Sequence, residues 1–240
     1  MRFSPANTKL KKLQKILNRR VFSFDLLSGH TCPGAKDCLA KVVYDWVQDS
    51  YNLVDGPKQK FRCYSASQEA QYTGTYNLRL ENWESIDKLN SVNKIASGLC
   101  RSLPAKAETV RIHSSGDFFK EIYFLAWVLV AKRNPDVVFY AYTKMNPFWV
   151  KHRNIMPDNF IMTASRGGKW DHLIDEHGLR ESVVVYSKDE ADQLGLELDN
   201  DDSHAADPSK RDQNFALLIH GMGPAGSKQA KIAAKIRNNS

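Results

Sequence analysis

Six short β-rich runs that alternate with helical sequence constrain the fold of this chain more than any other feature. Their near-continuous apolar character is typical of strands buried on both faces, as in parallel sheets. The runs cover residues 21–27, 110–114, 137–143, 160–165, 183–187 and 215–220. Because alternating strands and helices predict a wound parallel sheet, we expect a single α/β domain over residues 1–240.

Helical sequence follows most of these runs. Residues 118–132 carry apolar side chains at helical spacing and stop before Asn134 and Pro135, which end helices. The polar, proline-containing stretch 199–213 predicts a surface loop. Shorter helices are expected at residues 146–153, 169–177, 189–194 and 226–237.

A long insertion interrupts the alternation after the first strand. The insertion spans residues 29–105. It is preceded by a basic N-terminal segment, residues 1–20, and the first strand, and it is followed by the regular β/α units of residues 110–240. Within it we expect helices at residues 39–49 and 86–103. Long insertions after a strand tend to carry function in such folds, so we look for a site here.

Three cysteines in this insertion predict a metal or iron–sulfur site. Five residues separate Cys32 from Cys38, and 24 residues separate Cys38 from Cys63. Cys63 starts a helix-like segment, where the positive helix end favours a thiolate. Cys100 ends the helix before the second strand, at the opposite, amino-terminal end of the sheet, so we interpret it as a core residue.

The spacing of the three thiols leaves two kinds of metal site open. A structural zinc site prefers four ligands, and His30 is the obvious fourth. A [4Fe-4S] cluster held by three thiolates leaves one iron open to a substrate or cofactor, whereas simple electron carriers use four cysteines.

Polar and glycine residues follow each predicted strand. The carboxyl ends of parallel strands meet at one edge of a sheet, where ligands bind. Lys144 and Arg166 suit a carboxylate or a phosphate, or pair with acids at the rim. Asp117 suits an amino or hydroxyl group of a ligand, or caps a helix that begins at Phe118. The cofactor-binding residues we expect are Ser115, Gly116, Asp117, Lys144, Ser165, Arg166, Gly221 and Gly223.

The glycine turn at residues 221–226 matches G-x-G-x-x-G between a strand and a helix. Neither a later strand nor an acidic residue about 20 positions on follows it, which argues against a nicotinamide site. We interpret the turn as a helix N-terminus that receives an anionic or polar group.

Basic residues are concentrated at the two ends of a chain whose net charge is +7. The runs KLKKLQKILNRR and KQAKIAAKIRN are solvated helix faces or contacts for nucleic acid. No apolar run reaches the roughly 18 residues that a membrane span needs. The first residues lack the apolar core of a signal peptide, so we expect a cytoplasmic protein. In that compartment cysteine clusters bind metal more often than they form disulfides.

The arrangement of six β/α units, three cysteines after the first strand and the motif SSGD at residues 114–117 resembles the radical S-adenosylmethionine enzymes. The resemblance implies a partial (β/α)6 TIM-like barrel with a [4Fe-4S] cluster on Cys32, Cys38 and Cys63. It also implies S-adenosylmethionine near Asp117, Ser165, Arg166 and the glycine turn, and its reductive cleavage to a 5′-deoxyadenosyl radical. The cysteine spacing departs from that superfamily, which has x3 then x2 where this chain has x5 then x24.

At finer grain the chain is similar to the gene product 88 family of phage proteins. The similar motifs are HTCPGAKDC, RCYSASQEA, RIHSSGDFF, YAYTK, TASRGG, DDSHA and the IHG…PAGS ending. This resemblance implies a phage protein in the cytoplasm of an infected bacterium. The alternative to an enzyme is a non-enzymatic zinc or iron–sulfur module whose basic termini contact nucleic acid or a host protein.

Overall fold

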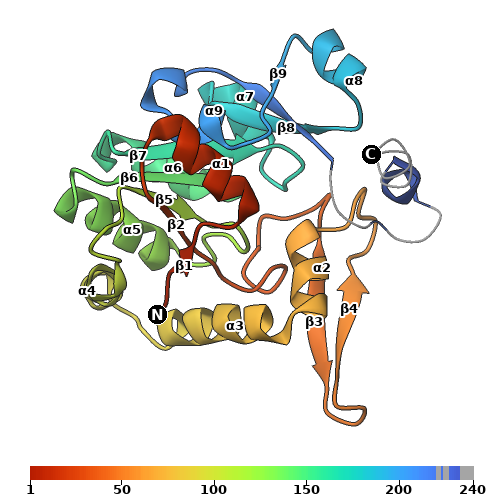
Figure 1. The fold of residues 1–240 in the computed structure, drawn as a ribbon, viewed down its shortest axis with the longest axis horizontal. Coiled ribbons are helices and arrows are strands. Elements are labelled where there is room, and N and C mark those ends of the chain that lie inside the picture. The colour runs from red at the N-terminus through yellow and green to blue at the C-terminus, as the bar shows by residue number, and fades with distance from the viewer. Residues whose placement is uncertain (220–222, 224–226, 233–240) are drawn as a thin grey trace.

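An eight-stranded sheet forms the centre of the computed structural model, which describes residues 1–219, 223 and 227–232 (Figure 1). The strands lie in the order β1-β2-β5-β6-β7-β8-β10-β9, and every neighbouring pair is parallel except β1 with β2. Their bounds are β1 (Ser4–Pro5), β2 (Val21–Phe24), β5 (Thr109–Ile112), β6 (Val138–Thr143), β7 (Phe160–Ser165), β8 (Glu181–Val185), β9 (Glu197–Leu198) and β10 (Phe215–Leu218).

The six predicted strands are confirmed as β2, β5, β6, β7, β8 and β10, which follow one another across the sheet in chain order. Successive β/α units produce this order, because each crossover places the next strand beside the last. The outermost strands, β1 and β9, leave the sheet open, so the pairing shows a mostly parallel sheet in a mixed α/β fold and does not show the predicted barrel.

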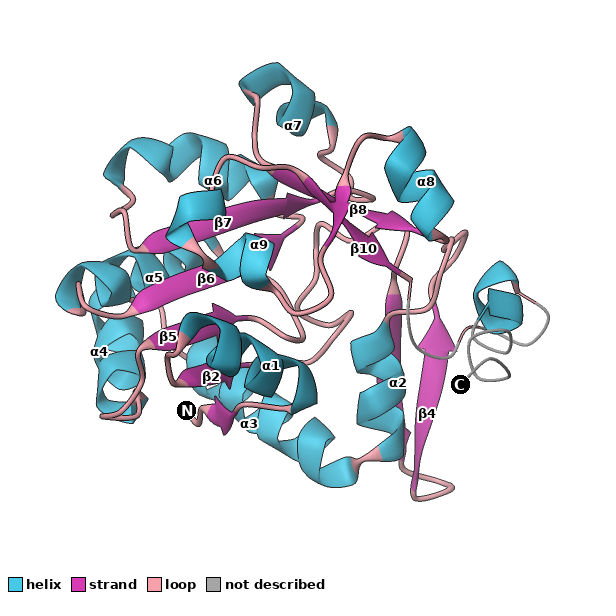
Figure 2. Ribbon diagram, turned by 45° about the horizontal axis from the view of Figure 1, so that its top comes forward, coloured by secondary structure: helices cyan, strands magenta, loops and turns pink. Residues whose placement is uncertain are grey.

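Helices lie on both faces of the sheet (Figure 2). The four predicted between the regular strands are present as α5, α6, α7 and α8. The helices are α1 (Thr8–Leu17), α2 (Tyr64–Gln71), α3 (Thr73–Asp87), α4 (Val92–Ser102), α5 (Glu121–Arg133), α6 (Asn146–His152), α7 (His172–His177), α8 (Lys188–Gln193) and α9 (Ser203–Ala206), with short 3-10 turns at Arg153–Ile155 and Pro208–Lys210.

Strand β6 sends alternate side chains into two cores. Phe139 of β6 packs with Trp127 of α5 in the larger core. Tyr140, the next residue, points to the other face and packs with Leu10 of α1 and Ala205 of α9. The two-residue period of a strand therefore buries both faces of β6, which explains its continuous apolar sequence.

The insertion contains a β-hairpin where the sequence predicts a helix over residues 39–49. β3 (Ala40–Asp45) and β4 (Ser50–Asp55) pair antiparallel and project from the body of the molecule (Figure 1), so that prediction is wrong. The first residues of β3 are alternately buried and exposed, a period of two that suits a strand. The Asp45 carboxylate accepts two backbone N–H groups of the turn, and Asp49 has a φ of 49°, which together close the hairpin.

The stretch 199–213 is not the predicted surface loop: it contains α9 and packs against the sheet. Asp202 is fully buried there, and it binds Lys9 and Arg111, each at 2.5 Å. Arg111 lies 91 positions earlier in the chain, so a local reading of polar sequence missed the partners that make burial favourable.

Two further boundaries differ from the predictions. Residues 86–103 form two helices, because α3 ends at Asp87 and α4 starts after Ser91, whose hydroxyl accepts the N–H of Lys94. The helix-like segment predicted to start at Cys63 is confirmed as α2, whereas most of α3 was not predicted. Of the helix predicted at residues 226–237, residues 228–232 are helical and the rest lies outside the described residues, apart from residue 227.

Candidate cysteine site

The carboxyl ends of the parallel strands bring most predicted site residues to one edge of the sheet. Cys32 and Cys38 follow β2, Asp117 follows β5 and Lys144 follows β6, while Ser165 is the last residue of β7. Because neighbouring parallel strands end at the same edge, residues far apart in the sequence become neighbours there.

The loop between the first two cysteines lies across the ends of β6 and β7. Its Gly34 carbonyl accepts the N–H of Lys169 at 2.9 Å, and its Asp37 N–H donates to the carbonyl of Gly167 at 3.0 Å. A Cβ on Gly34 would lie 3.1 Å from the Cβ of Lys144 and closer to its backbone, so only glycine permits this approach.

The segment that carries Cys63 is joined to the same loop. The carbonyl of Asp37 accepts the N–H of Lys60 at 2.8 Å, three residues before Cys63. Cys63 is the residue before α2, and Ser65 in the first turn donates its hydroxyl to the Ser114 carbonyl at 2.9 Å. These bonds fix both cysteine-bearing segments to one another and to the end of β5.

The three thiols, on partly exposed residues, lie close enough to influence one another. Burial raises the pKa of the Cys32 thiol well above its usual range, and Asp117 and the other two thiols raise it further. Burial, followed by Cys38, raises the pKa of Cys63 to about 12. Burial also raises the pKa of Cys38, while the nearby Lys144 lowers it. The free thiols therefore stay protonated at neutral pH, and a bound cation is needed to convert them together to thiolates.

Backbone N–H groups oppose this rise. The N–H groups of Ala66 and Ser65 in the first turn of α2 lower the pKa of Cys63, and that of Gly29 lowers the pKa of Cys32. Such N–H···S bonds at a helix N-terminus or a tight turn stabilise a thiolate.

A preformed site for a single metal ion is absent from the described residues, where no three His, Cys, Asp or Glu side chains are grouped to hold one ion. His30, the predicted fourth zinc ligand, has its Nε2 2.7 Å from the Val42 carbonyl and its ring beside that of Trp83. One of its two ring nitrogens is thus already engaged with the hairpin.

Asp117 is buried and accepts three hydrogen bonds. Its carboxylate receives the N–H of Phe118 at 2.7 Å, the hydroxyl of Thr143 at 2.6 Å and the N–H of Lys144 at 2.8 Å. Burial raises its pKa against these bonds. Because α5 begins at Glu121, Asp117 does not cap that helix; it joins the ends of β5 and β6.

Two of the predicted cofactor-binding residues face other protein groups. The Ser115 hydroxyl donates to Glu69 at 2.9 Å. Gly116 has a φ of 88°, and a Cβ there would lie 2.6 Å from the Thr31 hydroxyl. The SSGD turn therefore packs directly on the loop that leads to Cys32.

The charged candidates at β6 and β7 are also paired. Lys144 Nζ donates to the carbonyl and hydroxyl of Ser165, at 2.7 and 3.0 Å, and to the carbonyl of Arg166 at 2.9 Å. Arg166 binds Asp175 at 2.7 Å and also binds Glu181. Of its two predicted roles, it therefore has the second, which is pairing with acids at the rim.

The predicted glycine turn is only partly described. Gly221 lies outside the described residues, whereas a Cβ on Gly223 would lie 2.6 Å from the Cβ of Gln229. The side-chain oxygen of Gln229 accepts the N–H of Arg62 at 2.9 Å. The helical residues 228–232 therefore lie beside the segment that carries Cys63.

Sequence reasoning missed Glu69, the fully buried carboxylate on α2, together with its partners. A charged residue among the small residues of YSASQEAQ was the only signal available.

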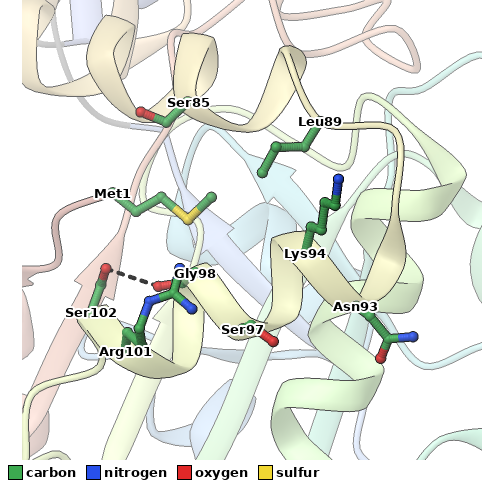
Figure 3. A pocket seen from close by; sticks show the side chains of 9 residues that line it. All are labelled: Met1, Ser85, Leu89, Asn93, Lys94, Ser97, Gly98, Arg101 and Ser102. Atoms are coloured by element: carbon green, nitrogen blue, oxygen red, sulfur yellow. Dashed lines mark hydrogen bonds between the residues drawn. The ribbon is translucent and has the colours of Figure 1, made fainter.

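A separate cavity lies between α3 and α4. It has a volume of about 570 Å³ and contains none of the predicted site residues; Figure 3 shows Lys94 and Arg101 at its wall. Its lining residues are Met1, Ser85, Leu89, Asn93, Lys94, Ser97, Gly98, Arg101 and Ser102.

The basic N-terminal run forms α1, which buries Leu10 and Leu13 and exposes lysines, as a solvated helix face does. Contact of this face with nucleic acid stays a prediction. Among the described residues no helix is long and apolar enough to cross a membrane.

Comparison with known proteins finds relatives in bacteriophages. The chain is 27% identical over 145 residues to the Gene 88 protein of Mycobacterium phage L5, an alignment that covers 57% of this chain and 52% of that protein. It is 26% identical over 125 residues to the Gene 88 protein of Mycobacterium phage D29, covering 49% and 44% respectively. The chain thus spans about half the length of these curated relatives. No solved structure matches it.

The model of one protein family, Gene product 88, matches residues 1–238. Since that match covers nearly the whole chain, the protein belongs to the gene product 88 family.

Proposed function

We propose that this protein binds a [4Fe-4S] cluster through Cys32, Cys38 and Cys63. The observation that carries the proposal is the junction of the two cysteine-bearing segments at Asp37, whose backbone bonds both Gly167 and Lys60. Two thiols from one loop and a third from a helix N-terminus supply three of the four ligands of a common cluster type.

A cluster suits these thiols better than a single zinc ion. Zinc–sulfur bonds of about 2.3 Å in a tetrahedral site require sulfur atoms within roughly 4 Å of one another. In the described residues no three His, Cys, Asp or Glu side chains are grouped to hold one ion, and His30 is engaged with the Val42 carbonyl. In a cluster each thiolate binds a different iron, so the sulfur atoms stand farther apart.

The residues around the thiols fit a negatively charged, thiolate-bound group. Backbone N–H groups of Gly29, Ser65 and Ala66 lower the pKa of Cys32 or Cys63 and so favour the thiolates. The Lys144 ammonium favours the thiolate of Cys38. Hydrogen bonds and local charge of this kind stabilise reduced clusters, and a bound cluster would supply one-electron chemistry at the iron without a cysteine ligand.

We extend the proposal to a radical S-adenosylmethionine-type reaction on a partial (β/α)6 barrel. The chain-order arrangement of β2, β5, β6, β7, β8 and β10 supports this architecture. Ser115 and Arg166 are already paired with protein carboxylates. Asp117 accepts three protein hydrogen bonds and Ser165 binds Lys144, so S-adenosylmethionine contacts at these residues rest on the resemblance alone. The phage relatives support action in the cytoplasm of an infected bacterium, where thiols stay reduced.

Metal analysis of two cysteine variants tests the cluster. Protein is purified and reconstituted without oxygen, and its iron and acid-labile sulfide are counted per chain. Cys38→Ala is expected to lose bound iron and sulfide, whereas Cys100→Ala, beside Asn134 at the other end of the sheet, is expected to keep both. Loss in both variants, or a colourless wild-type protein with stoichiometric zinc, would contradict the cluster.

A separate assay tests the reaction. Reduced protein is incubated with S-adenosylmethionine, and 5′-deoxyadenosine is quantified. Its formation by the wild type and not by Cys38→Ala is expected. The radical reaction would be contradicted if the cluster is intact but its spectrum does not change when S-adenosylmethionine is added, and no deoxyadenosine forms. The cluster proposal would then stand.

A further inference from the structure

Glu69 of α2 is fully buried and accepts four hydrogen bonds from three segments of the chain. The N–H and hydroxyl of Ser28 donate at 3.0 and 2.7 Å. The hydroxyl of Ser115 donates at 2.9 Å, and the guanidinium of Arg79 donates at 2.9 Å. Such an arrangement satisfies both carboxylate oxygens and balances the charge away from water.

Glu69 and its partner Ser28 belong to the two segments that carry the cysteines. Ser28 is four residues before Cys32 and lies in the loop that leaves β2. Glu69 itself is six residues after Cys63, in the helix that Cys63 precedes. One carboxylate therefore connects the two segments directly, and Ser115 connects both to the end of β5.

Arg79 holds this carboxylate in place from α3. It is also buried, and its second nitrogen donates to the Gln68 side chain at 2.8 Å. The guanidinium fork is rigid, so it fixes the rotation of α2 about its axis as well as its distance from α3. A buried ion pair of this kind often adds little to the free energy of unfolding. Such pairs are better known for specifying one arrangement of the elements that they join.

We infer that Glu69 is a positioning residue of the cysteine site, which fixes Cys63 relative to Cys32. The expected effect of Glu69 on iron retention rests on the proposed function, whereas its effect on the relative position of the Cys32 and Cys63 thiols does not. A contact next to the ligands alters metal retention without touching the metal, commonly by about 10–100-fold in affinity.

Asp202 provides a matched control. It is equally buried and bound to Arg111, Lys9, Tyr140 and Tyr142. These partners lie on α1, β5 and β6, and none belongs to a cysteine-bearing segment. Asp202→Asn therefore weakens a buried ion-pair network that includes neither cysteine-bearing segment.

The first experiment compares Glu69→Gln with Asp202→Asn after anaerobic reconstitution. Iron retained per folded chain is measured against increasing chelator. We expect Glu69→Gln to release iron at about 10-fold less chelator than wild type, and Asp202→Asn to behave as wild type. Equal release from both variants would overturn the inference, since the effect would then follow stability alone.

The second experiment uses metal-free protein in a Cys38→Ser, Cys100→Ser background, where only Cys32 and Cys63 remain, with phenylarsine oxide as a probe that bridges two neighbouring thiols. The wild-type and Asp202→Asn backgrounds are expected to bind it at the same rate, and Glu69→Gln several-fold more slowly. Unchanged binding in Glu69→Gln would also overturn the inference. Should the wild type take up no iron, the proposed function fails and this probe alone decides the role of Glu69.

Ser28→Ala and Ser115→Ala keep the Glu69–Arg79 ion pair and each remove one hydroxyl donor. Should Glu69→Gln fail to fold, these two variants go through both experiments. Wild-type iron retention and wild-type arsenical binding in both would overturn the inference.

Discussion

Two fully buried carboxylates, Glu69 and Asp202, perform different tasks in this molecule. Asp202 faces the cations of Arg111 and Lys9 and fastens α1 and α9 to the sheet. Glu69 has one cation, Arg79, and otherwise binds the N–H and hydroxyl of Ser28, in the segment that leads to Cys32, and the hydroxyl of Ser115 at the end of β5. The same chemical group therefore stabilises the body of the fold in one place and, in our proposal, the geometry of the cysteine site in the other.

The charge environment of Asp202 marks this difference. Burial alone would raise its pKa, but Arg111 and Lys9 hold the pKa at about 2. Desolvation that is outweighed by two cations indicates a carboxylate that contributes to stability across the whole neutral range.

Asp202→Ala is expected to have the largest effect on stability. Its removal leaves Arg111 as a buried charge without its carboxylate, which costs about 3–5 kcal/mol in the free energy of unfolding. Urea denaturation at neutral pH measures the loss. A change below about 1 kcal/mol would remove Asp202 from its role in the fold.

Acid should remove much of the stability that the ionised Asp202 carboxylate contributes. A depressed native pKa gives stability that is complete above the unfolded pKa, near 4, and is lost as pH falls through about 2. At about 1.4 kcal/mol per unit, roughly 2–3 kcal/mol of the advantage of wild type over Asp202→Asn should vanish between pH 5 and pH 2. Unfolding of both proteins across this range checks the prediction, and a constant difference would contradict it.

Ser115→Ala is expected to cost less in stability and more in the site. The lost hydrogen bond to a charged group costs about 1.5–3 kcal/mol. Because it removes one tie between α2 and the end of β5, iron retention should fall while Asp202→Asn keeps wild-type retention. Denaturation and chelator titration on the same samples separate the two effects.

Trp46→Ser at the hairpin tip should change neither property. Trp46 is 86% exposed and belongs to neither carboxylate network. Its free energy of unfolding should stay within about 0.5 kcal/mol of wild type, and its iron content should be unchanged. A larger loss of either would mean that the hairpin tip contributes to the site.

The sequence predicts well what depends on neighbours along the chain. The regular β/α units were recognised because Phe139 and Ala141 serve one face of β6 while Tyr140 serves the other. The gathering of Cys32, Asp117 and Lys144 followed from the rule that parallel strands end at one edge.

What the sequence did not predict depends on distant partners. Asp202 has the sequence neighbours of a surface residue, and its burial depends on Arg111, 91 positions away. The role of Glu69 likewise depends on Ser115, 46 positions away. The hairpin was missed because Val42 and Val43 suit a buried strand face and a helix equally until the turn at Asp45 is seen.

The Mössbauer spectrum of protein reconstituted with iron-57 tests the central claim most directly. A [4Fe-4S] cluster on Cys32, Cys38 and Cys63 predicts one iron whose signal differs from the other three, because it alone lacks a cysteine ligand. That signal should respond to S-adenosylmethionine if the proposed reaction is correct. A spectrum of a single mononuclear iron, of four equivalent irons, or of no bound iron would contradict the three-thiolate cluster.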